Sequence, residues 1–596
     1  MKRMTAAAIL AFALAMEVFG QGARQGESAG GAMSEGEAVC ARRCQRQEES
    51  AGGARPEVPG KGAMLTGEAA RRGGYGHTDP YRANLKFNAA SRTIDFKSYA
   101  GVSGITPYSS KLTEAELYTF TGTAPLSENA GNVYLSTLYT EASGVVPHYG
   151  FSLGYNPGGN HRFTLEFDGK NSTSHENGTL KEGLFAEGIE PIKTHWSLNS
   201  PILTENCYNV NAGYEYTISE KDRIKAEYSF RHDGEEVEKQ LNSISLKEYS
   251  AFSESLFKEL ELTFHHNFNL SYSHHFGCGD LQAAARYENR LARSKDHQWL
   301  DNALTLKNIF THRYRTGAVM ASYNYLPVKS LRLYAEFEYA YTSMNGRNLH
   351  DFLPRAIIEW HPDTEVLLSL KYDKLLVRPS LHYLNPAEVR EPLAIRAGNS
   401  DIVGMHLHKI SFDFDWKLPS LSAHLNASYL YTQDGFNAIW MERSNIRIYQ
   451  WSNEGVRHAV NITPSLKIKA SRTTEINASV SALWDKRIAE SVSLSNDNWG
   501  IAAHADLTQG LPAGFRINVH GDISYGSTLD LYRRADLAYN FGGRIERSFG
   551  KHFEAAIDAC YLRLSNDIIL QGAYSGHLIR RPGDHYGVGV EVRYKF

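Results

Sequence analysis

The residues best suited to chemistry in this sequence are its histidines, of which there are 24. Four of them form the doublets His265-His266 and His274-His275 in the stretch LTFHHNFNLSYSHHFG. Imidazole rings ligate metals and exchange protons near neutral pH. Neighbouring side chains of a strand point to opposite faces, so a doublet presents only one ring to a given metal. We therefore expect no metal site here, although His266 and His274 share a parity that would let them join a binding patch inside a barrel.

Cysteine is the second candidate for metal or redox chemistry, and the chain has five. Cys40 and Cys44 form a C-x3-C pair, and Cys207, Cys278 and Cys560 are scattered. The pair can form a disulfide in an oxidising compartment, but without a second pair or a histidine cluster it is a poor zinc signature. We find no catalytic motif among the serine, aspartate and histidine residues. The sequence therefore predicts neither an enzyme nor a bound cofactor.

The elements that must position any site are strands, because apolar and polar residues alternate along much of the chain. In SLRLYAEFEYAYTS, Leu331, Phe337 and Tyr339 share one face, and Arg332 and Glu338 lie on the other. Each such run is about ten residues long, which suits a tilted strand that crosses a bilayer. The same pattern recurs in the ranges 160–169, 222–230, 364–373, 474–484 and 515–525.

A closed barrel accounts for this pattern better than a soluble sandwich. After residue 20 no stretch approaches the roughly 18 apolar residues of a membrane helix. The 34 tyrosines suit strand ends at a membrane interface, and the net charge of -3 argues against a nucleic-acid partner. Closure removes the exposed edges of such a meander, and bilayers accept strands only in closed form. We predict an all-β protein, a large closed antiparallel transmembrane β-barrel in the bacterial outer membrane.

The N-terminal region divides into two segments ahead of the barrel. MKRMTAAAILAFALAMEVFGQ reads as a secretory signal peptide, residues 1–20, cleaved after Gly20. Residues 21–77 are rich in Gly, Ala, Glu and Arg, which predicts a disordered periplasmic segment. The barrel then covers residues 78–596, and at roughly 24 residues per strand and connection this gives about 22 strands.

The chain ends on GDHYGVGVEVRYKF, in which Val588, Val590 and Val592 share a face with the aromatic residues Tyr594 and Phe596. The last strand thus ends on its apolar face at the bilayer boundary. Tyr594 and Phe596 are similar to the terminal aromatic signature by which outer-membrane barrels are recognised for insertion. The expected partners are therefore the lipid bilayer and the barrel assembly machinery.

A segment in the middle of the chain resembles a known family. LVRPSLHYLNPAEVREPLAIRAGNSDIVGMHLHKISFDFDW resembles the R-P-S-x-x-x-L-N-P...G-N segment of TonB-dependent outer-membrane receptors and their outer-membrane β-barrel relatives. The matching residues are Arg378, Pro379, Ser380, Leu384, Asn385, Pro386, Gly398 and Asn399. Proline cannot donate to a continuing ladder, so the segment suits a strand that leaves the membrane into a long loop.

The resemblance implies a receptor or transport barrel for uptake of a nutrient. Residues 21–77 are too short and too polar for the plug domain of such receptors, so no plug is evident and coupling to TonB is left open. The alternative is a non-transporting barrel that serves as a surface-binding or structural component. Because an unfilled barrel would leak, we expect either a separate plug or surface subunit, or long connections folded inward, namely 170–204, 233–259 and 384–404.

Overall fold

The computed structural model describes most of the chain from residue 62 onward. The described ranges are 62–75, 81–91, 93–120, 132–185, 192–245, 252–300, 303–390, 394–443, 446–526, 537–550, 552–564, 566–570, 574–581 and 584–595. The predicted signal peptide, the cleavage point at Gly20, the cysteine pair and residues 21–61 lie outside them.

These residues form one large sheet whose pairings are antiparallel except between β15 and β18. Its strands are β1 (Gly62–Tyr75), β2 (Tyr81–Ala90), β3 (Ile94–Phe120), β4 (Asn132–Tyr155), β5 (His161–Phe185), β6 (Ile192–Thr217), β7 (Asp222–Ser245), β8 (Phe252–Phe276), β9 (Gly279–Leu300), β10 (Ala303–Val328), β11 (Leu331–Met344), β12 (Arg347–Trp360), β13 (Val366–Val377), β14 (Val389–Arg390), β15 (Ala394–Ala397), β16 (Met405–Lys417), β17 (Leu421–Arg443), β18 (Ile446–Lys469), β19 (Thr474–Ala489), β20 (Leu494–Gly510), β21 (Phe515–Tyr525), β22 (Ala538–Phe549), β23 (Phe553–Leu564), β24 (Asn566–Leu570), β25 (Tyr574–Arg581) and β26 (Asp584–Lys595).

Helical structure is confined to three short turns in the described part of the chain: α3 (Leu381–Leu384), η2 (Glu490–Val492) and η3 (Pro512–Gly514). Among the described residues, no helix has the length and apolar character needed to span a membrane.

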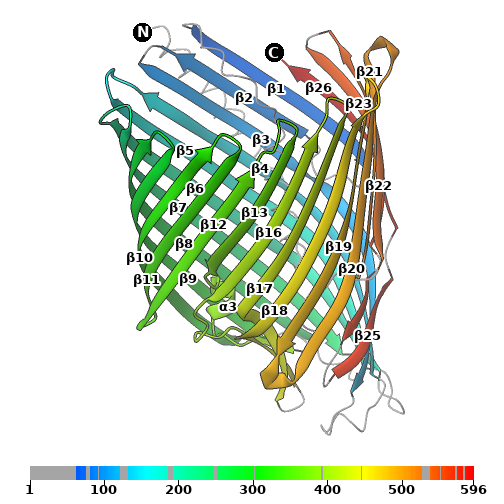
Figure 1. Cartoon of the computed structure of the whole chain (residues 1–596). Helices are drawn as coiled ribbons and strands as arrows, with labels where there is room; N and C mark the ends of the chain where they lie inside the picture. Colours follow the sequence, from blue (N-terminus) through cyan, green and yellow to red (C-terminus); the bar gives the residue numbers. More distant parts are fainter. Residues whose placement is uncertain are drawn as a thin grey trace, which may run out of the picture.

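The first strand corrects one expectation from the sequence. β1 lies inside the range 21–77 that its composition assigns to a disordered segment, yet its backbone pairs with β2 on one side and with β26 on the other. The sheet therefore begins at Gly62 rather than at residue 78. The sequence GAMLTGEAARRGGY has little apolar alternation, so its composition gives no sign of a strand. Backbone hydrogen bonds to two neighbouring strands position it instead. The first and last strands consequently lie side by side (Figure 1).

The two faces of the strands differ as the alternation predicts. On β10 the odd-numbered side chains are exposed, with Ile309 at 53% and Val319 at 58%, whereas His312 and Thr316 are buried. The predicted apolar faces of other strands are likewise exposed, as shown by Phe337, Tyr339, Leu370, Val480, Val519 and Val590. An apolar face that the described residues leave uncovered is the face expected to meet lipid.

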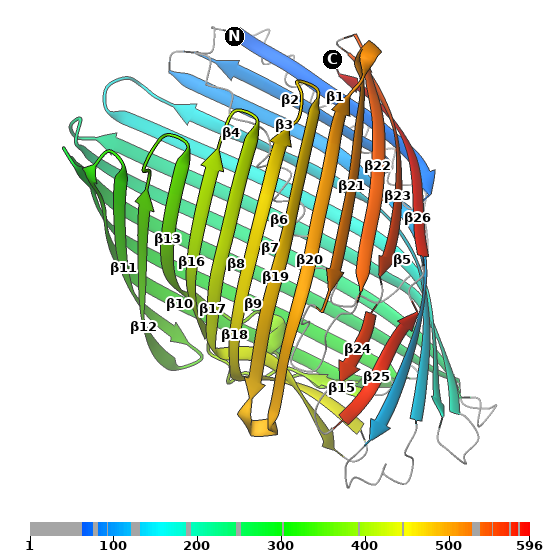
Figure 2. The same cartoon turned by 45° about the vertical axis from the view of Figure 1, so that its right-hand side comes forward.

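The two ends of the sheet also differ. Short turns join the strands at the end where Gly62 and Lys595 lie, which we call the termini end. Long hairpins extend from the opposite end, which we call the hairpin end (Figure 2). Most of the predicted connections 170–204 and 233–259 belong to these hairpins, as parts of β5 to β8, so their assignment as inward loops was wrong. These residues show no apolar alternation because both faces of the strands lie beyond the apolar band. There the strands are continued by backbone hydrogen bonds alone, which the side-chain pattern does not reveal.

Candidate functional site

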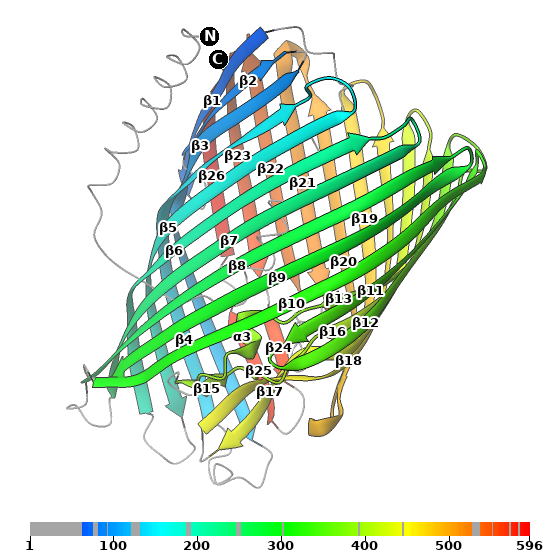
Figure 3. The same cartoon turned by 90° about the vertical axis from the view of Figure 1, so that its left-hand side faces the viewer.

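The third predicted inward connection does fold inward. We call residues 378–404, which join β13 to β16, the inward segment; its residues 391–393 lie outside the described ranges. α3 contacts β9, several strands away from β13. Figure 3 shows α3 within the curve of the sheet. Leu384 is fully buried, and Ile402 is 1% exposed.

Asn385 fixes one side of this segment. Its side-chain Nδ2 donates to Asp296 Oδ2 at 2.7 Å, and its Oδ1 accepts from Asn308 Nδ2 at 2.9 Å. The Asp296 carboxylate also accepts hydrogen bonds from Asn308 at 2.7 Å and from Ser294 at 2.6 Å, and Asp296 is only 1% exposed. A buried carboxylate is costly unless it is hydrogen-bonded, so these three donors make Asp296 a stable anchor on the inner face of β9.

The other side of the segment contacts strands across the lumen. The ring of Tyr383 lies 4.3 Å from that of Trp451 on β18 and 5.3 Å from that of Phe436 on β17. The backbone N–H of Val403 donates to Asn453 Oδ1 at 2.9 Å. The pairings place β11, β12, β13 and β16 between β10 and β17. A segment that contacts both β9–β10 and β17–β18 therefore crosses the inside of the curved sheet.

The motif residues explain the shape of this segment. The N–H of Gly398 donates to the carbonyl of Asn385 at 2.8 Å, and the N–H of Asn399 donates to the carbonyl of Tyr383 at 2.7 Å. A Cβ on Gly398 would lie 2.3 Å from the Asn385 carbonyl oxygen. The G-N pair is thus packed directly against the L-N-P turn. Only glycine permits this approach.

The R-P-S part of the motif forms the base of the segment. The Arg378 guanidinium donates to the Thr342 hydroxyl and forms an ion pair with Asp351 at 3.3 Å. His406 contacts the same carboxylate at 2.8 Å. Pro379 is almost completely buried, and β13 ends just before this Arg-Pro pair. The eight motif residues therefore lie in one substructure, with Ser380 at the position that precedes the first residue of α3.

Gly398→Ala is expected to destabilise the inward segment, because the added methyl meets backbone atoms that cannot rotate away. Overpacking of this kind costs about 1–3 kcal/mol. Gly317→Ala is the matched control, because no atom lies within 4 Å of a Cβ at that position on β10. Limited proteolysis of the purified protein should cut the segment faster only in Gly398→Ala. Equal cleavage of the two variants would show that the close packing does not hold the segment.

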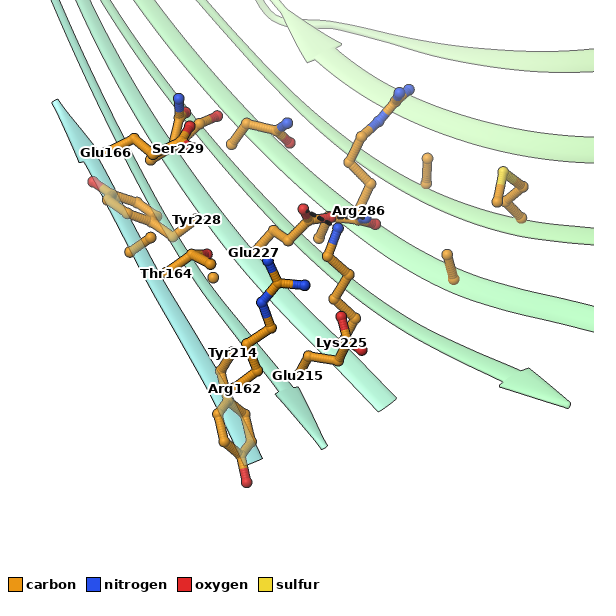
Figure 4. A pocket seen from close by; sticks show the side chains of 18 of the residues that line it. Arg162, Thr164, Glu166, Tyr214, Glu215, Lys225, Glu227, Tyr228, Ser229 and Arg286 are labelled. Carbon is orange, nitrogen blue, oxygen red and sulfur yellow. Dashed lines mark hydrogen bonds and ion pairs between the residues drawn. The ribbon is translucent and has the colours of Figure 1, made fainter. Parts of the chain in front are cut away.

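The inner wall carries a polar pocket nearer the termini end. Its volume is about 700 Å³, and it is lined by strands β5 to β11 (Figure 4). Three cations of the lining are Arg162, Lys225 and Arg286, and its carboxylates are Glu166, Glu215, Glu227 and Glu338.

Most of these charges are paired, either along one strand or between strands. Arg286 pairs with Glu338, and Lys225 pairs with Glu227 at 2.5 Å. Within the described ranges, Arg162 is left without an ion-pair partner and projects into the pocket. Such a wall can bind a polar solute or the surface of a polypeptide. Among the described residues, no group of three or more His, Cys, Asp or Glu side chains has the arrangement of a metal site.

Other residues singled out in the sequence lie apart from these two features. His266 and His274 face outward beside the exposed Phe268 and Leu270, so the predicted lumenal patch was wrong. His265 faces inward and contacts Glu288 at 2.9 Å.

The remaining candidates are also separate from the inward segment. Cys207, Cys278 and Cys560 are free thiols. Tyr594 lies on the exposed face of β26, and Phe596 lies outside the described residues. No local signal marked Asp296 as the anchor, because it lies 89 residues before Asn385.

Comparison with known proteins agrees with this architecture. Residues 342–549, which include the inward segment, match the profile of a family described as "Outer membrane protein beta-barrel family". The match covers about a third of the chain and indicates a bacterial outer-membrane location. A search of curated protein sequences finds no match to the chain.

Solved structures with the same fold are TonB-dependent receptors, which are receptors and transporters rather than enzymes. The copper transporter OprC is 10% identical, with 91% of this chain and 81% of that chain covered and a TM-score of 0.61. The ferric yersiniabactin uptake receptor FyuA from Yersinia pestis is 8% identical, with coverages of 91% and 81% and a TM-score of 0.59. A mutant of the ferric enterobactin receptor PfeA from Pseudomonas aeruginosa is 9% identical, with coverages of 90% and 81% and a TM-score of 0.57. At sequence identities this low, the similarity to these structures is a similarity of fold.

Membrane orientation of the outer-membrane barrel follows from its two ends. Barrels of this membrane have short periplasmic turns and longer extracellular loops. The termini end therefore faces the periplasm, and the hairpin end, with the inward segment, faces the outside of the cell.

Proposed function

We propose that this outer-membrane barrel is an uptake receptor that binds a nutrient at its extracellular end and passes it through the lumen. The observation that carries the proposal is the inward segment, which crosses the lumen at the hairpin end above a polar, charge-lined wall. A surface-binding or structural barrel would not need a polar path beneath its mouth. The copper and ferric-siderophore transport of the structural neighbours supports a metal complex too large for porins as the nutrient.

The proposal includes closure of the sheet into a barrel of about 22 strands. The pairing of β1 with β26 supports it, because these strands are the first and last of the described meander. A barrel of that size holds a wide lumen, which needs to be filled to prevent leakage. We propose that the inward segment fills part of it, and that a separate polypeptide docks on the polar wall where Arg162 is unpaired.

Uptake can be tested with a deletion strain. Growth and accumulation of radiolabelled iron or copper should fall when the chain is absent and a metal complex is the sole source. Complementation with the wild-type chain should restore growth and metal accumulation. If transport is TonB-coupled, a complemented strain that lacks TonB should show neither. Unchanged uptake of every metal complex and glycan tested would favour the non-transporting alternative.

We also propose that the barrel assembly machinery recognises the C-terminal strand. β26 pairs with both β23 and β1, so a defect there affects both neighbours. Tyr594→Ser together with deletion of Phe596 should leave the protein in the periplasm, where it is degraded. Fractionation and surface labelling measure this outcome, and Tyr561→Ser on β23 is the control. Normal surface exposure of the C-terminal variant would contradict the proposed signal. Cleavage after Gly20 is tested by N-terminal sequencing of the mature protein.

A further inference from the structure

Five cations gather on the outward face of β9 and β10 at the hairpin end. We call them the basic patch: Arg293, Lys295, Lys307, Arg313 and Arg315. On β10, Arg313 and Arg315 are exposed and have the same parity as Val319, which forms part of the lipid-facing surface. The patch therefore faces the membrane, not the lumen.

Strand register brings the members of the basic patch together. Arg293 lies opposite Thr311, and Lys295 lies opposite Ile309. Side chains on directly opposed and diagonal positions of an antiparallel pair lie roughly 5–8 Å apart. Arg293 is thus a diagonal neighbour of Arg313. The five cations form one cluster across two strands.

The height of the patch matches the head-group level of the outer leaflet. Gly317 pairs with Tyr287 on one side and with Tyr341 on the other, and both tyrosines are exposed on the outward face. Aromatic residues of this kind mark the edge of the apolar band of an outer-membrane barrel. Arg315 is the next outward residue beyond that level, followed by Arg313.

The cations of the patch have no carboxylate partner in the described part of the chain. Arg313 Nε instead donates to the neutral Asn289 Oδ1 at 3.0 Å, which orients its guanidinium. The outward positions directly opposite Arg293 on β8 and Arg315 on β11 are the uncharged Leu262 and Ser343. Clustered cations repel one another, so binding of an external anion would stabilise this surface.

A shallow pocket of about 350 Å³ lies over the two arginines of β10. It is lined by Thr311, Arg313, Arg315, Ser343, Asn345 and Gly346. Asn345 and Gly346, with φ of 50° and 77°, form the tight turn of the β11–β12 hairpin, which supports one edge of the pocket. Two guanidinium forks beside two hydroxyl groups are well suited to bind phosphate oxygens.

We propose that the basic patch binds the phosphate groups of a phosphorylated saccharolipid in the outer leaflet. The acyl chains would lie against the apolar face below Tyr287 and Tyr341, while the phosphates reach Arg313 and Arg315. A bound lipid would anchor β9–β11 on the outside, directly behind the Asp296 anchor that holds the inward segment on the inside. This assignment does not depend on the uptake proposal.

Binding of purified lipid A to the delipidated full-length protein in detergent tests the proposal, with a fluorescent lipid A as the probe. Arg313→Gln/Arg315→Gln should weaken binding at least tenfold. Arg547→Gln is the matched control and should change it less than twofold, because Arg547 packs over the rings of Phe515 and Phe549 on β21 and β22 near the termini end. Arg313→Lys/Arg315→Lys should retain part of the affinity. Heat-modifiability on a gel confirms that each variant is folded.

The second part of the experiment compares the binding of different lipids to the wild-type protein. Dephosphorylated lipid A should bind at least tenfold more weakly than lipid A, and phosphatidylglycerol should compete poorly. Equal affinity for the phosphorylated and dephosphorylated lipids, or for the Gln variant and wild type, would overturn the proposal. Displacement of lipid A by millimolar inorganic phosphate, or equally tight binding of phosphatidylglycerol, would overturn the saccharolipid assignment by showing a general anion or phospholipid site.

Discussion

Val519→Arg is expected to prevent stable assembly, whereas His520→Arg, one residue further along β21, is expected to be tolerated. Val519 is 48% exposed and lies between the aromatic ends of the strand, Phe515 and Tyr525, which places it near the middle of the apolar band. An arginine at the bilayer midplane of a β-barrel costs about 2–4 kcal/mol.

The control substitution introduces the same side chain on the other face. His520 lies opposite Asp506 on β20, so an arginine there enters the polar lumen beside a carboxylate. Refolding into lipid vesicles, followed by urea titration, compares the free energies of unfolding of the two variants. Equal destabilisation would mean that the assignment of lipid-facing and lumenal faces is wrong.

Asp296→Ala should release the inward segment from the wall. The substitution leaves the amides of Asn385 and Asn308 and the hydroxyl of Ser294 without their charged acceptor. Hydrogen bonds to charged groups contribute roughly 1.5–3 kcal/mol each, so the segment should lose at least about 2 kcal/mol of local stability. Protease digestion of intact cells should then cut within residues 378–404.

An exposed carboxylate on the same segment provides the comparison. Asp401 pairs with Arg347 at 2.8 Å, but its side chain is 76% exposed. Such surface pairs contribute about 0–1 kcal/mol, so Asp401→Ala should be cut at nearly the wild-type rate. If both variants are equally resistant to protease, Asp296 is not the anchor.

The lipid-facing strands were predictable because every second side chain of such a strand contacts lipid and must be apolar. In β11 and β21 the exposed face carries Phe337, Tyr339, Val519 and Ile523, in the alternation visible in the sequence. The same rule does not apply where strands extend beyond the membrane. The hairpin sequence NSTSHENGTLKEG therefore reads as a loop although it is part of β5.

The inward segment was only partly predictable. The residues that end β13 are adjacent to it in the sequence, whereas the residue that anchors it is distant. Pro379 and Pro386 correctly indicate that the chain leaves the ladder after β13. Nothing near them indicates Asp296 or Trp451, which are positioned by strands distant in the sequence. His266 and His274 show what the alternation leaves undetermined. Their even spacing correctly places them on one face of the strand, but it does not say whether that face meets lipid or the lumen.

The most direct test of the account is the single-channel conductance of the purified protein in planar bilayers, with and without the inward segment. Val377 pairs with Met405, so the ends of the segment are close enough for a short Gly-Ser turn to replace residues 379–403. This replacement should raise the conductance several-fold, because it clears the extracellular mouth of a water-filled lumen. The same conductance in both proteins would contradict it.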